Sequence, residues 1–264
     1  YRKHTKFSIN ESEEFATDSN NNFTNTNGEI IINIGIKGDL LSEISLKMIV
    51  NESENISIIP TKGIPYNIGS HLIDVINFKV SNIEIESLDH KYIDFVSMLN
   101  NEKSMDAEYD IIKDELICVN GNNYQKNSLS GGIKKKTYGI SRNFKKLTSI
   151  TPLPFSFTKS TGTALPIFML SNRNIPKIEI KKKLGTRLES IFEVENNLNK
   201  FKFSLICKYI TLSEEEKFRF LSSDQIYLLE KLKLPAINVN NDNTLINLKN
   251  RIPNIPIKSI FIYN

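Results

Sequence analysis

The stretch 152–180 constrains the fold most, because its apolar and polar residues alternate and break in the manner of short β-strands. Phe155 and Phe157 are separated by polar residues, which is the period-2 pattern of a half-buried strand. Gly162 follows within a Ser-Thr-Gly turn sequence, where it can adopt a positive φ. A second apolar run, 164–170, is broken by a proline, and a strand flanked by lysine and glutamate closes the stretch. The order predicted is strand, turn, strand, kink, strand.

Three further segments show the same alternation. Residues 29–37 follow an Asn-Gly turn and carry isoleucine at every second position. Residues 40–50 and 200–210 likewise place large apolar side chains along one face. Isoleucine and phenylalanine are favoured in strands. These patterns predict an all-β protein built from antiparallel strands.

Helical patterns are short. Residues 88–101 shift to an i, i+4, i+7 spacing of apolar residues, which predicts a short helix. A second helix is predicted at 212–222, with Ser213 as its N-cap and Glu216 completing a capping box. At 225–234 the apolar spacing fits a helix, but a strand is predicted there from the family resemblance given below.

Composition narrows the class of protein. The chain has 264 residues with 39% hydrophobic and 24% charged, which is enough for one large or two ordinary globular domains. Its net charge of +4 gives no case for specific nucleic-acid binding. Cys118 and Cys207 are far apart in apolar runs, so two buried thiols in a reducing compartment such as the cytosol are expected. No transmembrane helix or signal peptide is predicted, and the ends of the sequence suggest a piece of a longer protein.

Residues able to carry chemistry do not cluster in the sequence. The histidines His4, His71 and His90 are dispersed, and no pair has the spacing of metal ligands. Hydrolase, metalloprotease and dinucleotide-binding motifs are missing, and Gly131-Gly132 before three lysines lacks the spacing of a phosphate loop. The prediction is therefore a non-enzyme with no catalytic, cofactor-binding or metal-binding residues and no cofactor.

Five segments, taken in chain order, form a recognisable series: Tyr1-Arg2-Lys3-His4-Thr5 with Phe7, Gly38-Asp39-Leu40-Leu41, the stretch 152–180, residues 205–220, and Ile255–Tyr263. This series resembles the major capsid proteins of the nucleocytoplasmic large DNA viruses. The departures from the family pattern are Ser81-Asn82 where Gly-Gly is common, Ser213 in place of aspartate, and Lys217 in place of arginine, which loses bidentate pairing.

The resemblance implies a double jelly roll. Residues 1–182 are expected to form the first jelly-roll β-sandwich, 183–199 a connector, and 200–264 the truncated start of the second roll. In this family the two rolls make pseudo-hexagonal trimers that tile an icosahedral shell. The implied partners are copies of the chain itself, with minor capsid proteins or an inner membrane also expected. The implied location is the virion, after assembly in the host cytoplasm.

Two alternatives remain open at the level of sequence. A scaffold protein of poxvirus type would share the fold but form a transient lattice on a membrane. A jelly-roll carbohydrate-binding module would belong to another functional class and would expose aromatic platforms on one sheet. The complete lack of tryptophan, and aromatic residues embedded in apolar runs, argue against that module.

Overall fold

The computed structural model describes residues 8–15, 29–50, 68–71, 73–93, 96, 108–110, 115–119, 124–126, 133–135, 146–170, 174–182, 201–222 and 226. The Tyr1–Phe7 motif and the strand predicted at 255–263 lie outside these residues. The segment predicted at 225–234 also lies outside them, apart from Ile226.

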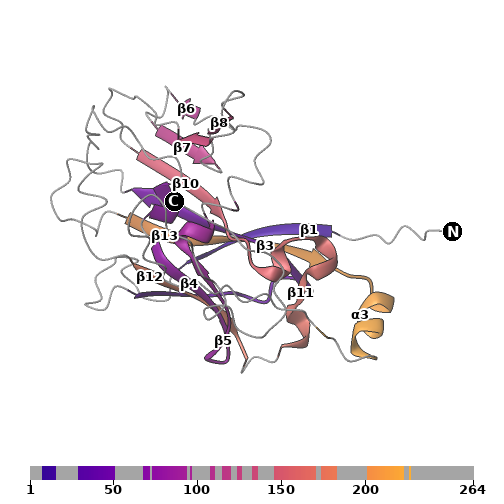
Figure 1. Cartoon of the computed structure of the whole chain (residues 1–264). Helices are drawn as coiled ribbons and strands as arrows, with labels where there is room; N and C mark the ends of the chain where they lie inside the picture. Colours follow the sequence, from indigo (N-terminus) through magenta and orange to yellow (C-terminus); the bar gives the residue numbers. More distant parts are fainter. Residues whose placement is uncertain are drawn as a thin grey trace, which may run out of the picture. The chain divides into compact units, whose positions relative to one another are not determined.

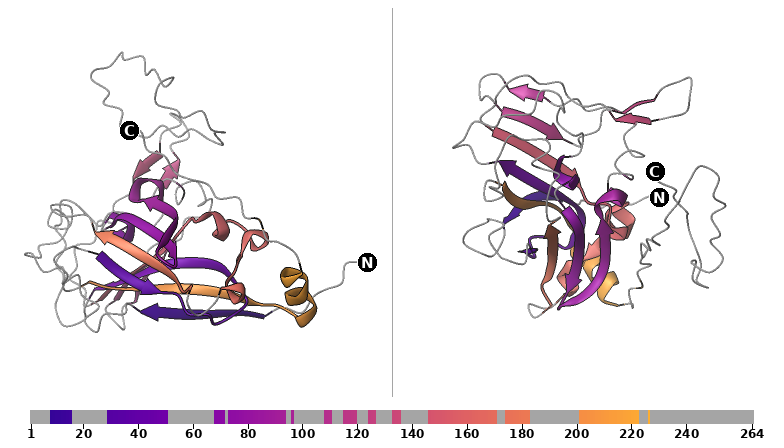
Figure 2. Two further views of the ribbon diagram at one scale, coloured as in Figure 1. Left: turned by 90° about the horizontal axis from the view of Figure 1, so that it is seen from below. Right: turned by 60° about the vertical axis from the view of Figure 1, so that its left-hand side comes forward.

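Within the described residues, the strands form two large sheets and one small hairpin (Figures 1 and 2). The first sheet has seven strands in the order β1-β13-β3-β10-β7-β6, with β11 pairing β3, and the second has the order β2-β12-β4-β5. All pairings are antiparallel except the parallel contact of β10 with β7. The strands are β1 (Ser8–Phe15), β2 (Glu29–Asn33), β3 (Leu40–Val50), β4 (Ile73–Val80), β5 (Ile83–Asp89), β6 (Glu108–Asp110), β7 (Glu115–Val119), β8 (Tyr124–Lys126), β9 (Ile133–Lys135), β10 (Lys146–Pro152), β11 (Leu165–Pro166), β12 (Pro176–Lys182) and β13 (Phe201–Thr211).

Eight of these strands have the connectivity of a jelly roll. Counted in chain order, β1 pairs with β13, β2 with β12, β3 with β10, and β4 with β5. The first strand thus pairs with the eighth, the second with the seventh, the third with the sixth and the fourth with the fifth, as when one long hairpin is rolled into two sheets. The predicted all-β jelly-roll sandwich is confirmed. The short strands β6 and β7 widen the first sheet beyond β10.

The core lies between the inward faces of the two sheets. Phe78 from the second sheet meets Phe155 and Phe157, with ring centroids 5.7 and 5.0 Å away. The rings of Phe155 and Phe157 stack on each other with centroids 5.6 Å apart. The isoleucines predicted on one face of 29–37 are buried up to Ile34, whereas Ile36 is exposed. Other buried members are Leu41, Ile44, Leu46, Met48, Ile73, Ile76, Leu88, Ile93, Leu153, Ile167, Ile178, Ile180, Phe203, Leu205, Cys207 and Tyr209.

An irregularity in the pairing of β13 with β3 explains one unusual feature of the apolar pattern. Leu41 and Ile44 are both buried, although three positions separate them and a regular strand would place them on opposite faces. The register shifts between Lys208 and Tyr209, so that Lys208 opposes Glu43 and Tyr209 opposes Leu41. The extra residue in β3 is characteristic of a β-bulge, which turns both apolar side chains inward.

The segment 152–170 departs from the strand-turn-strand prediction. It forms three short 3-10 helices, η1 (Ser156–Thr158), η2 (Thr161–Thr163) and η3 (Ile167–Met169), with only the two-residue strand β11 between them. Prolines at 152, 154 and 166 cannot donate ladder hydrogen bonds, which disfavours regular strands here. Gly162 lies in η2, and its φ is outside the left-handed region. The prediction of a positive φ at this residue is therefore wrong.

Strand β13 corrects the predicted start of the second roll. Residues from 200 onward were expected to open a new domain, but β13 lies in the middle of the first sheet, with β1 on one side and β3 on the other. Its side chains Phe203 and Leu205 are buried in the same core as Phe78. The segment is therefore the eighth strand of the first roll, and without it that sheet would have no connection between β1 and β3.

Two local predictions hold. Ser81 and Asn82 form the turn between β4 and β5, with φ of 50° and 69°, so this Ser-Asn pair adopts the left-handed conformation expected of the family's Gly-Gly. A helical segment follows β5 at 90–93, two residues later than predicted, because residues 88 and 89 still belong to that strand. The short helix α1 (Ile68–His71) precedes β4.

Candidate functional site

A connected group of polar contacts lies at the end of the sandwich where β3 begins and β13 ends. Gly38 lies directly against β13, and a Cβ atom added at this position would be 2.5 Å from Cβ of Tyr209. Only glycine permits such an approach of the two backbones. Glycine at position 38 is thus a packing requirement, and it brings Asp39 beside the end of β13.

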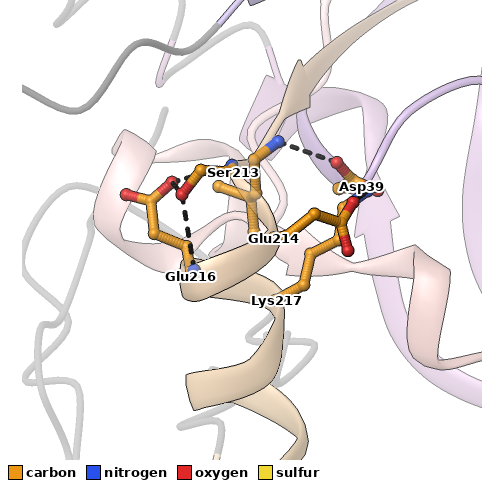
Figure 3. Close-up of polar contacts among 6 residues, drawn as sticks. Asp39, Ser213, Glu214, Glu216 and Lys217 are labelled. Atoms are coloured by element: carbon orange, nitrogen blue, oxygen red, sulfur yellow. Dashed lines mark hydrogen bonds and ion pairs between the residues drawn. The ribbon is translucent and has the colours of Figure 1, made fainter.

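Asp39 links four parts of the fold. Its backbone N–H donates to the carbonyl of Ile210 at 3.1 Å, and its carbonyl accepts from the N–H of Phe168 at 3.2 Å. Its carboxylate accepts from the N–H of Leu212 at 2.7 Å and lies 3.2 Å from Nζ of Lys217 (Figure 3). One largely buried side chain therefore fixes the direction in which the chain leaves the first roll.

The helix α3 (Glu214–Leu221) begins with the predicted capping box. The backbone N–H of Glu216 donates to Oγ of Ser213 at 3.4 Å, and Oε2 of Glu216 accepts from the N–H of Ser213 at 3.0 Å (Figure 3). Serine therefore satisfies the helix N-terminus where the family commonly has aspartate. Lys217 contacts both Asp39 and Glu214, and the hydrogen bonds to these two carboxylates raise its pKa.

Apolar contacts cover the same corner. Phe220 of α3 meets Phe168 edge to face, with ring centroids 6.1 Å apart. These two rings pack on a small cluster separate from the main core. Its buried members are Leu40, Ala164 and Ile210, and Leu212 packs against them. We call the whole arrangement around Asp39, Ser213, Lys217 and Phe220 the exit corner.

Replacing Ser213 by alanine should lower the free energy of unfolding by about 1 kcal/mol, because the N–H of Glu216 loses its acceptor at the helix N-terminus. Urea denaturation followed by circular dichroism would measure the change. Ser222→Ala is the matched control at the other end of α3, where the serine is exposed and donates to the carbonyl of Arg219. Equal losses in the two variants would contradict the capping role.

Polar networks on the two sheets were not predicted from the sequence. Glu13 of β1 accepts from Oγ of Ser204 at 2.5 Å and pairs with Nζ of Lys47 at 2.9 Å, so it reaches across β13 to β3. On the second sheet, Glu179 lies 2.5 Å from Nζ of Lys79. Burial alone would raise the pKa of each carboxyl, but hydrogen bonds and the adjacent lysine charge outweigh burial and lower both pKa values.

Acid should weaken the sandwich through these carboxylates. A carboxyl whose folded pKa is below its ordinary value of 4.5 contributes stability above that value and loses it as the pH falls through the folded pKa. We therefore expect the free energy of unfolding to fall as the pH is lowered below 4.5. Denaturation curves at neutral and acidic pH would test this. In Glu179→Gln the loss on acidification should be smaller, and an identical loss would contradict the assignment.

A second polar group surrounds the hydroxyl of Tyr209, near the edge of the core. This hydroxyl donates to the carbonyl of Gly35 at 2.9 Å and lies 3.3 Å from Glu14, which in turn pairs with Lys37 at 2.8 Å. Burial raises the pKa of Tyr209, so the phenol stays protonated and acts as a donor. The adjacent thiol of Cys207 is buried and unbonded to another sulfur, and burial raises its pKa to about 12. This is an inert packing thiol.

The histidines named in the sequence remain apart from these groups where they are described. His71 lies in α1, His90 is buried after β5 with Nδ1 3.5 Å from Asp89, and His4 is outside the described residues. No group of three potential ligands that could hold a metal ion occurs among the residues the structure describes. The predicted lack of catalytic, metal and cofactor residues stays a prediction. None of the described helices is long and apolar enough to span a membrane.

Comparison with known proteins gives a family and a fold. Residues 1–195 match the family model of the major capsid protein N-terminus. No curated protein matches the chain. The crystal structure of VP54 of PBCV-1, fitted into a reconstruction of the virophage Sputnik, is similar with a TM-score of 0.57 and 18% identity, over 88% of this chain and 49% of that one.

Two further solved structures are similar. The quasi-atomic model of the PBCV-1 virus capsid gives a TM-score of 0.55, again with 18% identity, 88% of this chain and 49% of that one. The Faustovirus major capsid protein gives a TM-score of 0.49 at 8% identity, over 84% of this chain and 57% of that one. The chain thus spans about half the length of the solved structures it matches. Because the family model covers residues 1–195 of the 264, the chain belongs to the major capsid protein N-terminus family.

Proposed function

We propose that the full-length protein assembles into pseudo-hexagonal trimers that tile the icosahedral shell of a large DNA virus. The observation that carries this is the complete eight-strand roll. Its eighth strand, β13, lies between β1 and β3, and α3 follows directly after β13 in the chain. The solved relatives are about twice as long as the chain, which is the length needed for a second roll. Three copies of a two-roll subunit would place six similar barrels around one axis.

The proposed division of the chain follows the pairing of β13. The first roll runs through Thr211, and the second begins C-terminal to α3. The exit corner would then set the angle between the two rolls, because Asp39 of the first roll contacts Leu212 and Lys217 and Phe168 packs against Phe220 of α3. In this proposal the protein acts through shape and subunit contacts and carries out no chemistry.

The test is the assembly state of the full-length protein. Expression of the complete coding sequence followed by native mass spectrometry should give trimers, and electron microscopy should show particles of pseudo-hexagonal outline. A monomer with no assembled form would contradict the proposal.

Mass spectrometry of mature virions separates a capsid protein from a transient scaffold of poxvirus type, since only the former remains in the particle. The same virions would reveal minor capsid proteins or membrane beside the shell, and infected-cell imaging would test assembly in the cytoplasm.

A further inference from the structure

A strip of exposed apolar side chains follows the eighth strand of the roll. Phe218 and Leu221 of α3 are 72% and 64% exposed, and Ile226, shortly after the C-cap residue Ser222, is 92% exposed. Among the described residues, Ile83 is the only other large apolar side chain more exposed than Leu221. Single exposed apolar residues are normal, but three of them close together indicate a surface that another body covers. We call Phe218, Leu221 and Ile226 the exit strip.

The helix α3 carries apolar side chains on two sides. On one side Phe220 packs on Phe168 of the first roll, and Lys217 reaches Asp39 of that roll. Phe218 lies about 200° from Phe220 around the helix axis, and therefore on the opposite side. Leu221, three residues after Phe218, is its neighbour on the helix surface. Because the first side is held on the roll at the end of β13 (Figure 1), the exposed side has a fixed direction.

The length of the solved relatives indicates what covers the exit strip. Each of the two PBCV-1 structures is about twice as long as this chain, which matches 49% of it. In the proposed function the additional length forms a second roll, and this roll follows α3 in the chain. A body joined to the chain directly after α3 is held close to the exit strip, which gives it a high effective concentration there.

The size of the exit strip favours a tethered partner over a separate protein. Even a large aromatic side chain buries only about 150–250 Å². Three side chains therefore bury less than the roughly 800 Å² per partner that is typical of a complex between separate proteins. A tethered body loses less translational freedom when it docks, so that a smaller contact can hold it. This argues against a second copy of the chain as the occupant.

We propose that the exit strip is the docking surface for the second roll of the same chain. The helix α3 is then packed on both sides, with Phe220 against the first roll and Phe218 and Leu221 against the second. The surface that meets the strip is apolar, because a polar group buried there without a hydrogen bond would be unfavourable. This inference rests on the proposed two-roll protein and adds to it the residues through which the rolls touch.

Photo-cross-linking of the full-length protein tests this contact. Phe218→p-benzoylphenylalanine places a light-activated group of similar shape on the strip. After irradiation, a denaturing gel should show the cross-linked product at the mass of one chain, and peptide mass spectrometry should join position 218 to the part of the chain that follows Ile226. Ile83→p-benzoylphenylalanine is the matched control, because Ile83 is equally exposed but lies at the start of β5. It should give no cross-link to that part of the chain.

Three outcomes would overturn the proposal. A product at the mass of two chains, joined through position 218, would show that a second copy covers the strip. A cross-link from position 218 to the first roll would show that the strip folds back on its own domain. No cross-link at position 218 would leave the strip without a partner in the full-length protein.

Thermal unfolding gives a second readout. Phe218→Ala should leave the midpoint of the 264-residue chain unchanged, because the ring is exposed there. In the full-length protein the same change should lower the midpoint by about 2–4 °C, the shift expected when one ordinary contact of a domain is lost. Equal shifts in the two proteins would contradict the docking surface.

Failure of this inference can be told from failure of the proposed function. The trimer is read from the native mass of the wild-type full-length protein, whereas the docking surface is read from the cross-link within one chain. Trimers without that cross-link would refute the docking surface alone. A cross-linked protein that stays monomeric would refute the trimer alone.

Discussion

Phe155→Ala should lower the free energy of unfolding by about 3–5 kcal/mol, the range found when a buried phenylalanine is truncated. The side chain is fully buried, and its ring contacts both Phe78 and Phe157, so the change leaves a cavity at the meeting point of η1 and the second sheet. The neighbouring η1 is held by Glu86, whose carboxylate accepts from the N–H of Ser156 at 2.9 Å. The backbone there cannot easily move inward to fill the space.

Urea denaturation monitored by circular dichroism would give the difference in unfolding free energy for Phe155→Ala. Phe218→Ala is the matched control, because the ring of Phe218 is 72% exposed on α3. Its loss should be within about 0.5 kcal/mol of zero. Comparable losses in the two variants would show that the three-ring contact does not carry the stability assigned to it.

Gly38→Ala should lower the free energy of unfolding by about 1–3 kcal/mol, as expected when an added methyl group forces packed atoms apart. The new Cβ would lie 2.5 Å from Cβ and 3.3 Å from Cγ of Tyr209. Because that Cβ is attached directly to the backbone of β13, relief requires the strand itself to move away from β3. The displacement would also weaken the bond from the hydroxyl of Tyr209 to Gly35.

Gly162→Ala provides the comparison for this second prediction. A Cβ at position 162 would meet only Oγ of Ser160, at 3.8 Å, and the backbone there is outside the left-handed region. Alanine at this site should be neutral or stabilising by about 0.4–1 kcal/mol, because it restricts the unfolded chain. The same denaturation assay serves both variants. A Gly38→Ala protein as stable as the wild type would mean that β3 and β13 are not in the close contact described.

Local sequence signals predicted local structure well. The capping box of Ser213 and Glu216 is formed within four residues, and it is present as predicted. The Ser81-Asn82 turn likewise depends on two adjacent residues. Alternating isoleucines marked β2 correctly because one face of that strand packs on the core. In each case, the residues that determine the structure are neighbours in the sequence.

Predictions failed where structure depends on distant partners. The apolar alternation of β13 identified a strand, but nothing within residues 201–211 indicates that its partners are β1 and β3. The alternation of Phe155 and Phe157 suggested a strand, yet Phe155 is the N-cap of η1 and Phe157 lies within η1, and both rings are in the core. The exit corner shows the same limit. Asp39 and Lys217 form an ion pair but are far apart in the chain, and no local sequence pattern indicates their contact.

The position of β13 also determines when this domain can fold during synthesis. Strand β1 is made about 200 residues before β13, its only described partner strand, is completed at Thr211. Until that residue has emerged from the ribosome, the nascent chain exposes an unpaired β1 and one open side of β3. Sheets built from such distant pairings fold slowly and expose aggregation-prone edges while they wait. We therefore expect chains that have not yet reached Thr211 to aggregate more readily than the chain that contains β13.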